Sequence, residues 1–388
     1  MKPLPRIVEV NLSRAVGGAE IYTAFFTRAL STRGWPNLAV VHAGAAFWDD
    51  FDFGGAQRAA VRGEDEIVAL VRPGDLVVVH APLGKQALAA ISAKAFLVGV
   101  AHAAIYDGTR PLYYDAADRM LAVSRFMIAN LQAQGIGPVH PEPLLGVAEI
   151  DRRVHAGAVV RGPLCDWDSR KLRDRVLAQA AAVRARFARP EPYRRRPGLV
   201  LGIVSRLAPQ KQFPALFRVL APIIAARADV ALEIFGPAVG YKALRELREA
   251  TAPIAARTRF WGHQRDVAPL YPAFDYLVAG LPEREALGLN VIESCILGTP
   301  VLAVRAPPFD ETVVDGGTGF LYTDPRQDGG RDFARVLDGI RSGLLRPDLP
   351  AMGAHLAQFS FSRFTERADA AMHAIARAAA AAGRSGTI

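Results

Sequence analysis

The stretch "YLVAGLPEREALGLNVIESCILGTP", residues 276–300, contains a strand, a loop and a helix in succession. Its apolar start (276–280) is typical of a buried strand, and the run after Gly288 has the apolar content of a helix that we expect to begin near Leu289. Glu285 lies in the loop. Glu293 lies three residues beyond Asn290, so it returns to the same helix face one turn in.

Two carboxylates at this spacing suggest a ligand site. The backbone N–H groups of Gly288, Leu289 and Asn290 would be free at the helix N-terminus, where anions bind. Glu293 could accept hydrogen bonds from a vicinal diol such as a ribose, and Glu285 would reach the sugar side of the same ligand. The alternative is that both glutamates only complement the helix dipole. That alternative does not explain a carboxylate inside an otherwise apolar run, because burying one is costly.

Apolar segments that read as strands alternate with amphipathic helical stretches along the whole chain of 388 residues. Strands that are almost continuously apolar are covered on both faces, and their alternation with helices indicates parallel sheets. We therefore predict an α/β protein with two doubly wound Rossmann-like domains facing a central cleft, residues 1–190 and 191–358. A C-terminal helix, 359–388, is expected to return to the first domain. The predicted strands are 6–10, 38–43, 76–81, 95–102, 120–124, 199–205, 231–236, 258–262, 276–280 and 299–304.

Two further motifs follow predicted strands, and ligands of such sheets bind at the carboxyl ends of strands. After the first strand, "VGGAEIY" places Gly17 and Gly18 in a tight loop at a helix N-terminus, where backbone N–H groups can approach an anion. An ordinary strand–helix turn is an equal alternative, and the sequence is not the GxGxxG of dinucleotide-binding proteins. After the strand 199–205, "VSRLAPQKQF" carries Arg206 and Lys211, two cations that could neutralise a diphosphate. A plain surface pair is equally compatible with that spacing.

Composition excludes several classes of protein. No apolar run approaches the roughly 18 residues of a transmembrane helix, and the N-terminus lacks the core of a secretory signal, so we expect a cytoplasmic protein. Cys165 and Cys295 are expected to be free thiols. The net charge is +9, and residues 170–196 hold ten basic and two acidic residues. This segment is either a solvated helix face with a linker or a patch that meets anionic membrane at its inner face. No nucleic-acid recognition motif accompanies it, so no nucleic-acid partner is expected.

The motifs together resemble a known family. "EALGLNVIE" resembles the E-x7-E motif of retaining glycosyltransferases with the GT-B fold, "VSRLAPQKQF" resembles their R-x4-K motif, and "GGAEIY" resembles their N-terminal glycine loop. The segments "FWGHQRDVAPLY" and "ETVVDGGTGFLYTDP" are similar to the flanking segments of that family. All five occur in the family's order over about residues 6–330. The chain is thus similar to the family-4 type, which builds bacterial surface polysaccharides, lipopolysaccharide and glycolipids.

The resemblance implies a role for each matching position. The first domain would bind a glycan or lipid-linked acceptor, and the second would bind a nucleotide-sugar linked to UDP or GDP, with no other cofactor. Arg206 and Lys211 would hold the diphosphate, and Glu285 would stabilise positive charge near the anomeric carbon. The remaining roles are ribose binding by Glu293; phosphate or sugar contacts by Gly288, Leu289, Asn290 and Val291; a base pocket lined by Phe235, Gly236 and His263; diphosphate contact by the loop of Gly17 and Gly18; and a hydrogen bond from His102 to sugar or acceptor.

Departures and rivals remain open. Ala286 stands where the family usually has a glycine, which would alter the fit of the sugar, and His80 rivals His102. The D-x-D sequences at 50–52 and 166–168 are the metal motif of the other large glycosyltransferase fold, but the two-domain pattern with R-x4-K favours a reaction without metal. A nucleotide-sugar epimerase of the same fold, a non-catalytic nucleotide- or carbohydrate-binding protein and a dehydrogenase are the competing functions. The sequence does not define an oligomeric state.

Overall fold

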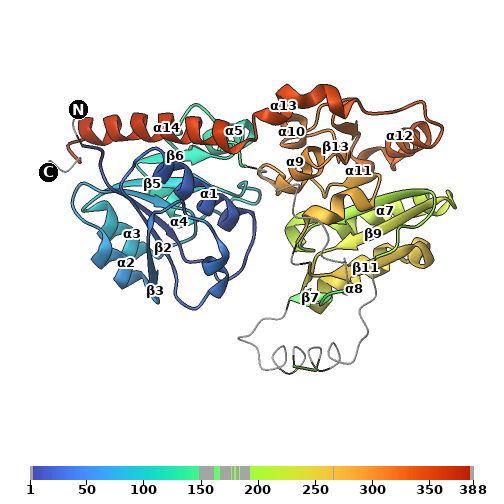
Figure 1. Ribbon diagram of the computed structural model, residues 1–388, viewed down its shortest axis with the longest axis horizontal. Helices are drawn as coiled ribbons and strands as arrows, with labels where there is room; N and C mark the ends of the chain where they lie inside the picture. The colour runs from blue at the N-terminus through green and yellow to red at the C-terminus, as the bar shows by residue number, and fades with distance from the viewer. Residues whose placement is uncertain are drawn as a thin grey trace. The chain divides into compact units, whose positions relative to one another are not determined.

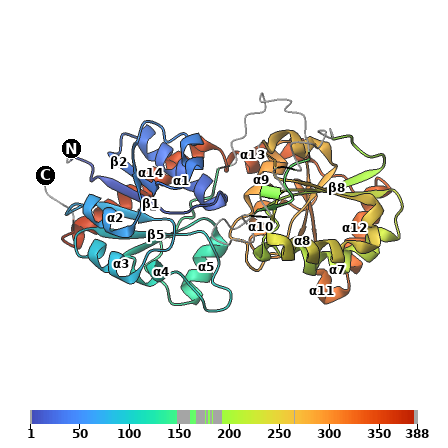
Figure 2. The same cartoon turned by 90° about the horizontal axis from the view of Figure 1, so that it is seen from below.

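The computed structural model describes residues 3–147, 161–166, 193–264 and 266–384, together with 176, 179, 180 and 183. The chain divides into two compact units. The first consists of Met1–Glu149 with Ala357–Ile388, and the second consists of Ile150–Leu356. Figures 1 and 2 show helices on both sides of the sheet in each unit. The predicted α/β class with two Rossmann-like domains is confirmed.

The first unit is built on six parallel strands in the order β3-β2-β1-β4-β5-β6. Its four central strands are buried along their length or nearly so, which explains their apolar sequences. The strands are β1 (Ile7–Asn11), β2 (Asn37–His42), β3 (Gln57–Val61), β4 (Leu76–Val79), β5 (Phe96–Ala101) and β6 (Arg119–Ala122). The helices are α1 (Gly18–Thr32), α2 (Glu64–Leu70), α3 (Lys85–Ser92), α4 (Leu112–Ala116), α5 (Arg125–Ala133) and α14 (Phe361–Ala381), with η1 (Ala46–Asp50).

The last helix of the chain, α14, packs on α1 of the first unit (Figure 1). The ring of Phe364 meets Tyr22 edge-on at a centroid distance of 5.3 Å. Trp35 donates an Nε1–H hydrogen bond to Asp369 at 2.8 Å. The apolar face of α14 is therefore part of the core of the first unit, although it follows the second unit in sequence.

The second unit repeats this architecture with the strand order β11-β9-β8-β12-β13-β14, again all parallel. The strands are β8 (Leu199–Val204), β9 (Val230–Phe235), β11 (Thr258–Gly262), β12 (Tyr276–Val278), β13 (Val301–Val304) and β14 (Gly319–Tyr322), with a separate pair of β7 (Cys165–Asp166) and β10 (Ala238–Val239). The helices are α7 (Phe213–Ala225), α8 (Gly240–Ala250), α9 (Leu289–Ile296), α10 (Phe309–Thr312), α11 (Pro325–Asp328), α12 (Arg331–Arg341) and α13 (Gly353–Ala357). The short 3-10 helices are η2 (Pro209–Lys211), η3 (Ala252–Arg257), η4 (Ala268–Ala273) and η5 (Leu349–Met352).

The boundary between the units differs from the expectation. Residues 161–166 were assigned to the first domain, but they pair with the second unit. Gly162 donates its N–H to Trp261 at 2.7 Å, and Pro163 accepts the N–H of His263 at 2.8 Å. These backbone bonds add the stretch to the β9–β11 side of the second unit, so the first unit ends earlier than residue 190.

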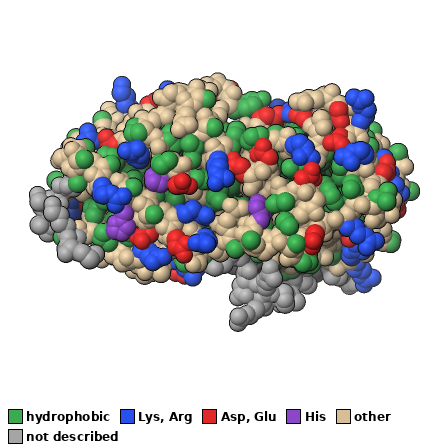
Figure 3. Space-filling model, turned by 90° about the horizontal axis from the view of Figure 1, so that it is seen from above, with side chains coloured by type: hydrophobic (Ala, Val, Ile, Leu, Met, Phe, Trp, Pro, Cys, Tyr) green, Lys and Arg blue, Asp and Glu red, His purple; other side chains and the backbone are tan. Residues whose placement is uncertain are grey.

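The distribution of charge and the cysteines bear on two other expectations. On the face shown in Figure 3, basic side chains lie among acidic ones. The basic segment 170–196 lies mostly outside the described residues, so its contact with a membrane stays a prediction. Cys165 and Cys295 are both buried free thiols, as expected. Among the described residues, no helix is long and apolar enough to cross a membrane.

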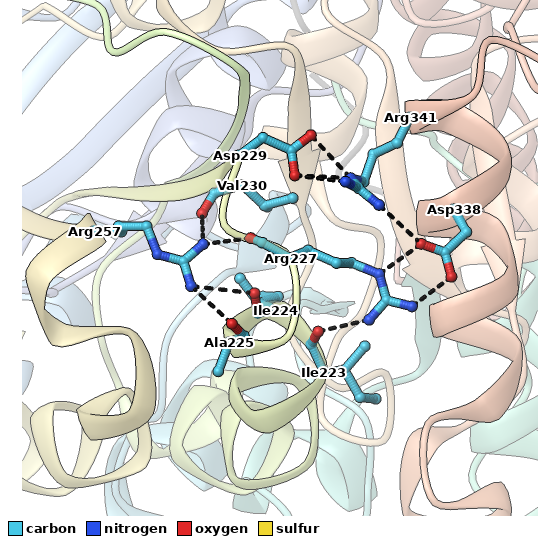
Figure 4. A network of polar contacts seen from close by, with 9 residues as sticks. All are labelled: Ile223, Ile224, Ala225, Arg227, Asp229, Val230, Arg257, Asp338 and Arg341. Carbon is cyan, nitrogen blue, oxygen red and sulfur yellow. Dashed lines mark hydrogen bonds and ion pairs between the residues drawn. The ribbon is translucent and has the colours of Figure 1, made fainter.

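Arginine side chains form a network of polar contacts at one end of the second sheet (Figure 4). Arg257, at the end of η3, donates hydrogen bonds of 2.5–3.4 Å to four carbonyl groups, including those of Ile224 and Ala225 in the last turn of α7. It thereby satisfies acceptors that a helix C-terminus leaves open. Arg341 of α12 instead binds the half-exposed carboxylate of Asp229.

This difference predicts unequal costs of substitution. Arg257→Ala should lower the free energy of unfolding by about 1–3 kcal/mol, because buried carbonyls lose their donor. Arg341→Ala is the matched control, since it removes an arginine from two exposed pairs, with Asp229 and Asp338, that are each worth about 0–1 kcal/mol. Urea denaturation of the two variants would measure both values. Equal losses would contradict the capping role of Arg257.

Candidate functional site

The predicted site residues of the second unit lie where its strand order reverses. The chain runs from β8 outward to β9 and β11, and then returns to β12 and proceeds to β13 on the other side. The carboxyl ends of β8 and β12 are therefore neighbours at the switch point, where ligands of such sheets bind. Lys211 follows β8, and Glu285 follows β12.

Lys211 and Glu285 form an ion pair through Nζ and Oε2. Both side chains are partly buried, so the pair holds the two loops together at the switch point. The backbones also meet, because Leu281 donates its N–H to the carbonyl of Lys211 at 3.2 Å. A Cβ on Gly280 would lie 2.4 Å from that carbonyl oxygen, so only glycine permits this approach.

The residue after Lys211 has an uncommon backbone. Gln212 has a φ of 53°, and no other non-glycine residue among those described has a positive φ. Its side chain donates to Glu283 at 3.0 Å, and Arg326 binds the same carboxylate. Such conformations cost free energy and persist where the surroundings fix them. The hydrogen bond to Glu283 is one such restraint, and it directs the neighbouring Lys211 toward the loop after β12.

Helix α9 begins at Leu289, as the sequence predicts, and Gly288 precedes it with a φ of 80°. The side chain of Asn290 donates to the carbonyl of Val204 at 3.0 Å, which ties the helix to the end of β8. The N–H of Val291 donates to the carbonyl of Gly288 at 3.0 Å. The prediction that this N–H contacts a ligand is therefore wrong. The N–H groups of Leu289 and Asn290 in the first turn precede the intrahelical ladder.

Glu293 is held by a partner that the sequence did not reveal. Tyr271 of η4 donates its hydroxyl to Oε2 of Glu293 at 2.7 Å. Burial raises the pKa of Glu293, and the Tyr271 hydroxyl and the charge of Lys211 act in the opposite direction. The carboxylate is thus fixed beside a cation with one oxygen engaged. Among the hydrogen bonds of the described residues, the Tyr271 bond is to Oε2 and none is to Oε1.

Arg206 follows β8 directly and lies 3.6 Å from the carboxylate of Asp166. Both side chains are roughly half exposed, 40% and 46%, so this ion pair is weak and open to competition. Arg206 and Lys211 are thus each paired with a carboxylate. A diphosphate would compete with Asp166 for one cation and with Glu285 for the other.

The three residues that were predicted to line a base pocket have different surroundings. The ring of Phe235 is only 1% exposed and lies among Trp261, Phe274 and Tyr193, so it cannot line a pocket as predicted. Gly236 has a φ of 119°, and a Cβ there would lie 2.0 Å from the carbonyl oxygen of Ser205. The ends of β8 and β9 can approach only because residue 236 is glycine. His263 is exposed at the end of β11.

The glycine loop of the first unit follows β1. Gly17 is the N-cap of α1 in an extended conformation, and Gly18 is the first helical residue. Glu20, in the first turn of α1, is buried, and burial raises its pKa, whereas nearby polar groups of Ser13, Gly17 and Asn11 act in the opposite direction. The helix N-terminus that was predicted to bind an anion therefore already carries a carboxyl group of the chain itself.

The two rival histidines of the first unit are in contact. His80 follows β4 and His102 follows β5. Their Nδ1 and Nε2 atoms lie 3.1 Å apart. His80 is 3% exposed, whereas His102 is only partly buried. Burial lowers the pKa of both, that of His102 to about 3. His102 is thus the histidine that can meet a ligand, and it is neutral at physiological pH.

Sequence reasoning did not find Tyr271, Glu283, Arg326 or Asp166. All four reach the site residues through tertiary contacts. Tyr271 lies 22 positions before Glu293, and Arg326 lies 43 positions after Glu283. A tyrosine in an apolar 3-10 segment gives no local signal that its hydroxyl meets a carboxylate.

Comparison with known proteins shows what the chain is similar to. The model of the family Glycosyl transferases group 1 matches residues 198–338. A D-inositol 3-phosphate glycosyltransferase of Geodermatophilus obscurus is 34% identical over 197 residues, which span 47% of this chain and 42% of that protein. The match therefore covers less than half of this relative's length.

Solved structures match over nearly the whole chain. Anabaena Alr3699/HepE in complex with UDP-glucose has a TM-score of 0.67 at 18% identity, covering 95% of this chain and 99% of the other. The lipopolysaccharide outer core galactosyltransferase WaaB in its apo form has a TM-score of 0.63 at 15% identity, covering 96% and 99%. At such identities these matches establish the fold. Residues 198–338 of the second unit are thus similar to the glycosyl transferases group 1 family, and the chain shares the two-domain fold of these solved structures.

Proposed function

We propose that this protein is a retaining, metal-independent glycosyltransferase. It would move a sugar from a UDP- or GDP-linked donor to a glycan or lipid-linked acceptor in the synthesis of bacterial surface polysaccharide or lipopolysaccharide. The observation that carries the proposal is the cluster at the β8–β12 switch point. There Lys211, Glu285 and Glu293 lie together beside the first turn of a helix.

The residues of this cluster suit the parts of a nucleotide-sugar. Arg206 and Lys211 supply positive charge for the diphosphate, which is the work that a metal ion does in other transferases. Glu293 has an oxygen left to accept hydrogen bonds from the ribose hydroxyls. The first turn of α9 adds N–H groups for phosphate or sugar. Glu285 is displaced from Lys211 by the diphosphate and faces the positive charge that develops at the anomeric carbon.

The reaction needs no covalent intermediate with the protein. The bond from the anomeric carbon to the phosphate oxygen breaks, and the acceptor oxygen bonds to the same face of that carbon. The acceptor's proton passes to the leaving phosphate oxygen. Arg206 and Lys211 stabilise the diphosphate as it takes up negative charge. His102 in the first unit would hydrogen-bond the sugar or the acceptor.

The donor class can be measured by ligand-dependent thermal stabilisation. We expect one nucleoside diphosphate among UDP, GDP and ADP to raise the melting temperature, with the same rise in EDTA, whereas CMP and NAD have little effect. A ligand at 100 times its Kd adds about 2.7 kcal/mol to the stability of the state that binds it. A rise that EDTA abolishes would contradict metal independence, and a rise with NAD alone would favour a dehydrogenase.

Substitution of the cations tests the catalytic assignment. Arg206→Ala and Lys211→Ala should each lower kcat by about 10²–10³, as removal of an oxyanion donor does in other enzymes. Arg218→Ala and Lys242→Ala are the matched controls, because both side chains are exposed on helices of the same unit. Sugar transfer to an acceptor would be measured beside donor conversion without an acceptor. Conversion without an acceptor would indicate an epimerase, and wild-type rates in both cation variants would refute the proposal.

A further inference from the structure

A chain of three ionisable side chains runs through the first unit from its buried sheet to His102. Glu9 on β1 is 1% exposed, and its Oε2 lies 3.8 Å from Nε2 of His80. Nδ1 of His80 lies 3.1 Å from Nε2 of His102. Glu9 has no place in the proposed transfer reaction, and a carboxyl group in the centre of an apolar sheet needs an explanation.

The side chains around Glu9, His80 and His102 are largely apolar. The ring of Phe26 lies 5.6 Å from that of His80, and Tyr22 lies edge-on to His102 at 4.9 Å. The ionisable and charged groups nearby are Tyr22 on α1, whose pKa burial raises, Arg367 on α14, whose charge acts on that hydroxyl, and Tyr114 on α4, on whose pKa the backbone of His102 acts. Thr27 of α1 and Asn37 of β2 act on Glu9.

Within the series Glu9, His80 and His102, two buried atoms lack hydrogen-bond partners. Oε1 of Glu9 and Nε2 of His80 make no hydrogen bond in the described part of the protein. An N–H without an acceptor is costly at a buried position, whereas a bare nitrogen lone pair is better tolerated. The position of the His80 proton therefore depends on whether Glu9 can accept it.

The hydrogen bonding of Glu9 indicates which form the group takes. The Thr27 hydroxyl lies 2.7 Å from Oε2 of Glu9 and 2.9 Å from the carbonyl of Thr23, and its single proton can serve only one of these acceptors. Oε1 of Glu9 has no donor among the described residues, so an ionised carboxylate would be buried with few hydrogen bonds. Burial raises the pKa of Glu9 to about 8, against smaller opposing effects of Thr27 and Asn37, so the neutral form predominates at pH 7.

A neutral Glu9 favours one arrangement of protons. With no carboxylate to bind, an N–H at Nε2 of His80 would be buried without an acceptor. On Nδ1 the same proton forms the 3.1 Å bond to His102. His102 then accepts at Nε2 and carries its own proton on Nδ1. An ionised Glu9 would favour the opposite arrangement. The proton of His80 would lie on Nε2, His102 would donate from Nε2 to Nδ1 of His80, and Nδ1 of His102 would be an acceptor.

We propose that Glu9 and His80 are positioning residues that fix His102 in the Nδ1–H tautomer, so that His102 acts as a hydrogen-bond donor to its ligand and not as a base. The ligand atom is then an oxygen with an available lone pair, from a sugar hydroxyl or a phosphate. This inference rests on the proposed function for its ligand but not for its tautomer.

The pH dependence follows from the same arrangement. Because burial raises the pKa of Glu9 to about 8, the donor tautomer is present below that pH and is lost as the pH rises through it. His102 does not gain a proton near neutrality, since burial lowers its pKa to about 3. We therefore expect kcat/KM to fall above about pH 8 in the wild-type protein. Glu9→Gln cannot ionise, so this fall should be absent from the variant.

The first experiment is nitrogen NMR of the full chain labelled in its histidines, which reads tautomers without any assay of transfer. His102 would be assigned with His102→Gln, and His373→Asn provides a control on the exposed side of α14. We expect His102 to be protonated at Nδ1 and bare at Nε2 at pH 6.5, and to exchange these roles by pH 9.5. In Glu9→Gln the pH 6.5 form should persist at pH 9.5. Protonation of His102 at Nε2 at pH 6.5, or the same response in both proteins, would overturn the proposal.

Kinetics on a second pair of variants separate positioning from structure. His80→Leu should lower kcat/KM about 10–100-fold, as loss of an orienting partner does for metal-bound histidines. His80→Asn retains a donor near the position of Nδ1 and should recover most of that loss. Equal defects in the two variants, with melting temperatures like the wild type, would contradict the proposal. If no donor is turned over but the His102 tautomer behaves as expected, the proposed function is wrong, whereas the positioning of His102 by Glu9 and His80 is supported.

Discussion

The contact on which the second unit depends is the ion pair of Lys211 with Glu285 at the reversal of strand order. It joins the loop after β8 to the loop after β12, and the missing side chain of Gly280 allows the two backbones to meet there. Gln212, in its left-handed conformation, and the Glu283–Arg326 pair hold the same loops from the other side. A partly buried charge without its partner is costly, so the pair restrains both loops.

The two units use the same architecture for different chemistry. In the second unit, polar side chains at the switch point are cations and carboxylates that remain accessible at the ends of strands. In the first unit, the carboxyl ends of β1, β4 and β5 are followed by a glycine loop and two neutral histidines. The apolar surroundings keep those histidines unprotonated, and the carboxyl group of Glu9 beneath them keeps its proton. The first unit is therefore suited to directional hydrogen bonds, whereas the second is suited to the binding of charge.

Much of this architecture could be predicted from sequence because parallel strands buried on both faces are continuous apolar runs. The start of α9 at Leu289 was predictable because a glycine precedes an apolar helical run. The strand β3 was missed because it is largely exposed and carries Gln57 and Arg58, which hide its periodicity. Phe235 was misassigned because the family resemblance implies a base pocket there, whereas Phe235 ends β9 and its ring completes an aromatic core. The partners Tyr271 and Glu9 could not be predicted, because a side-chain contact across the fold leaves no mark in local sequence.

The pairing of both site cations with carboxylates has a consequence for selectivity. Asp166 and Glu285 pair with the two cations that, in the proposed function, would bind the phosphates. A ligand with a single phosphate group can replace only one of them, and it gains little over the pair that it breaks. A ligand with two linked phosphates replaces both at once, because the second exchange is intramolecular. In the proposed function, these two carboxylates would thus discriminate against inorganic phosphate and nucleoside monophosphates, because each single phosphate must break an existing ion pair.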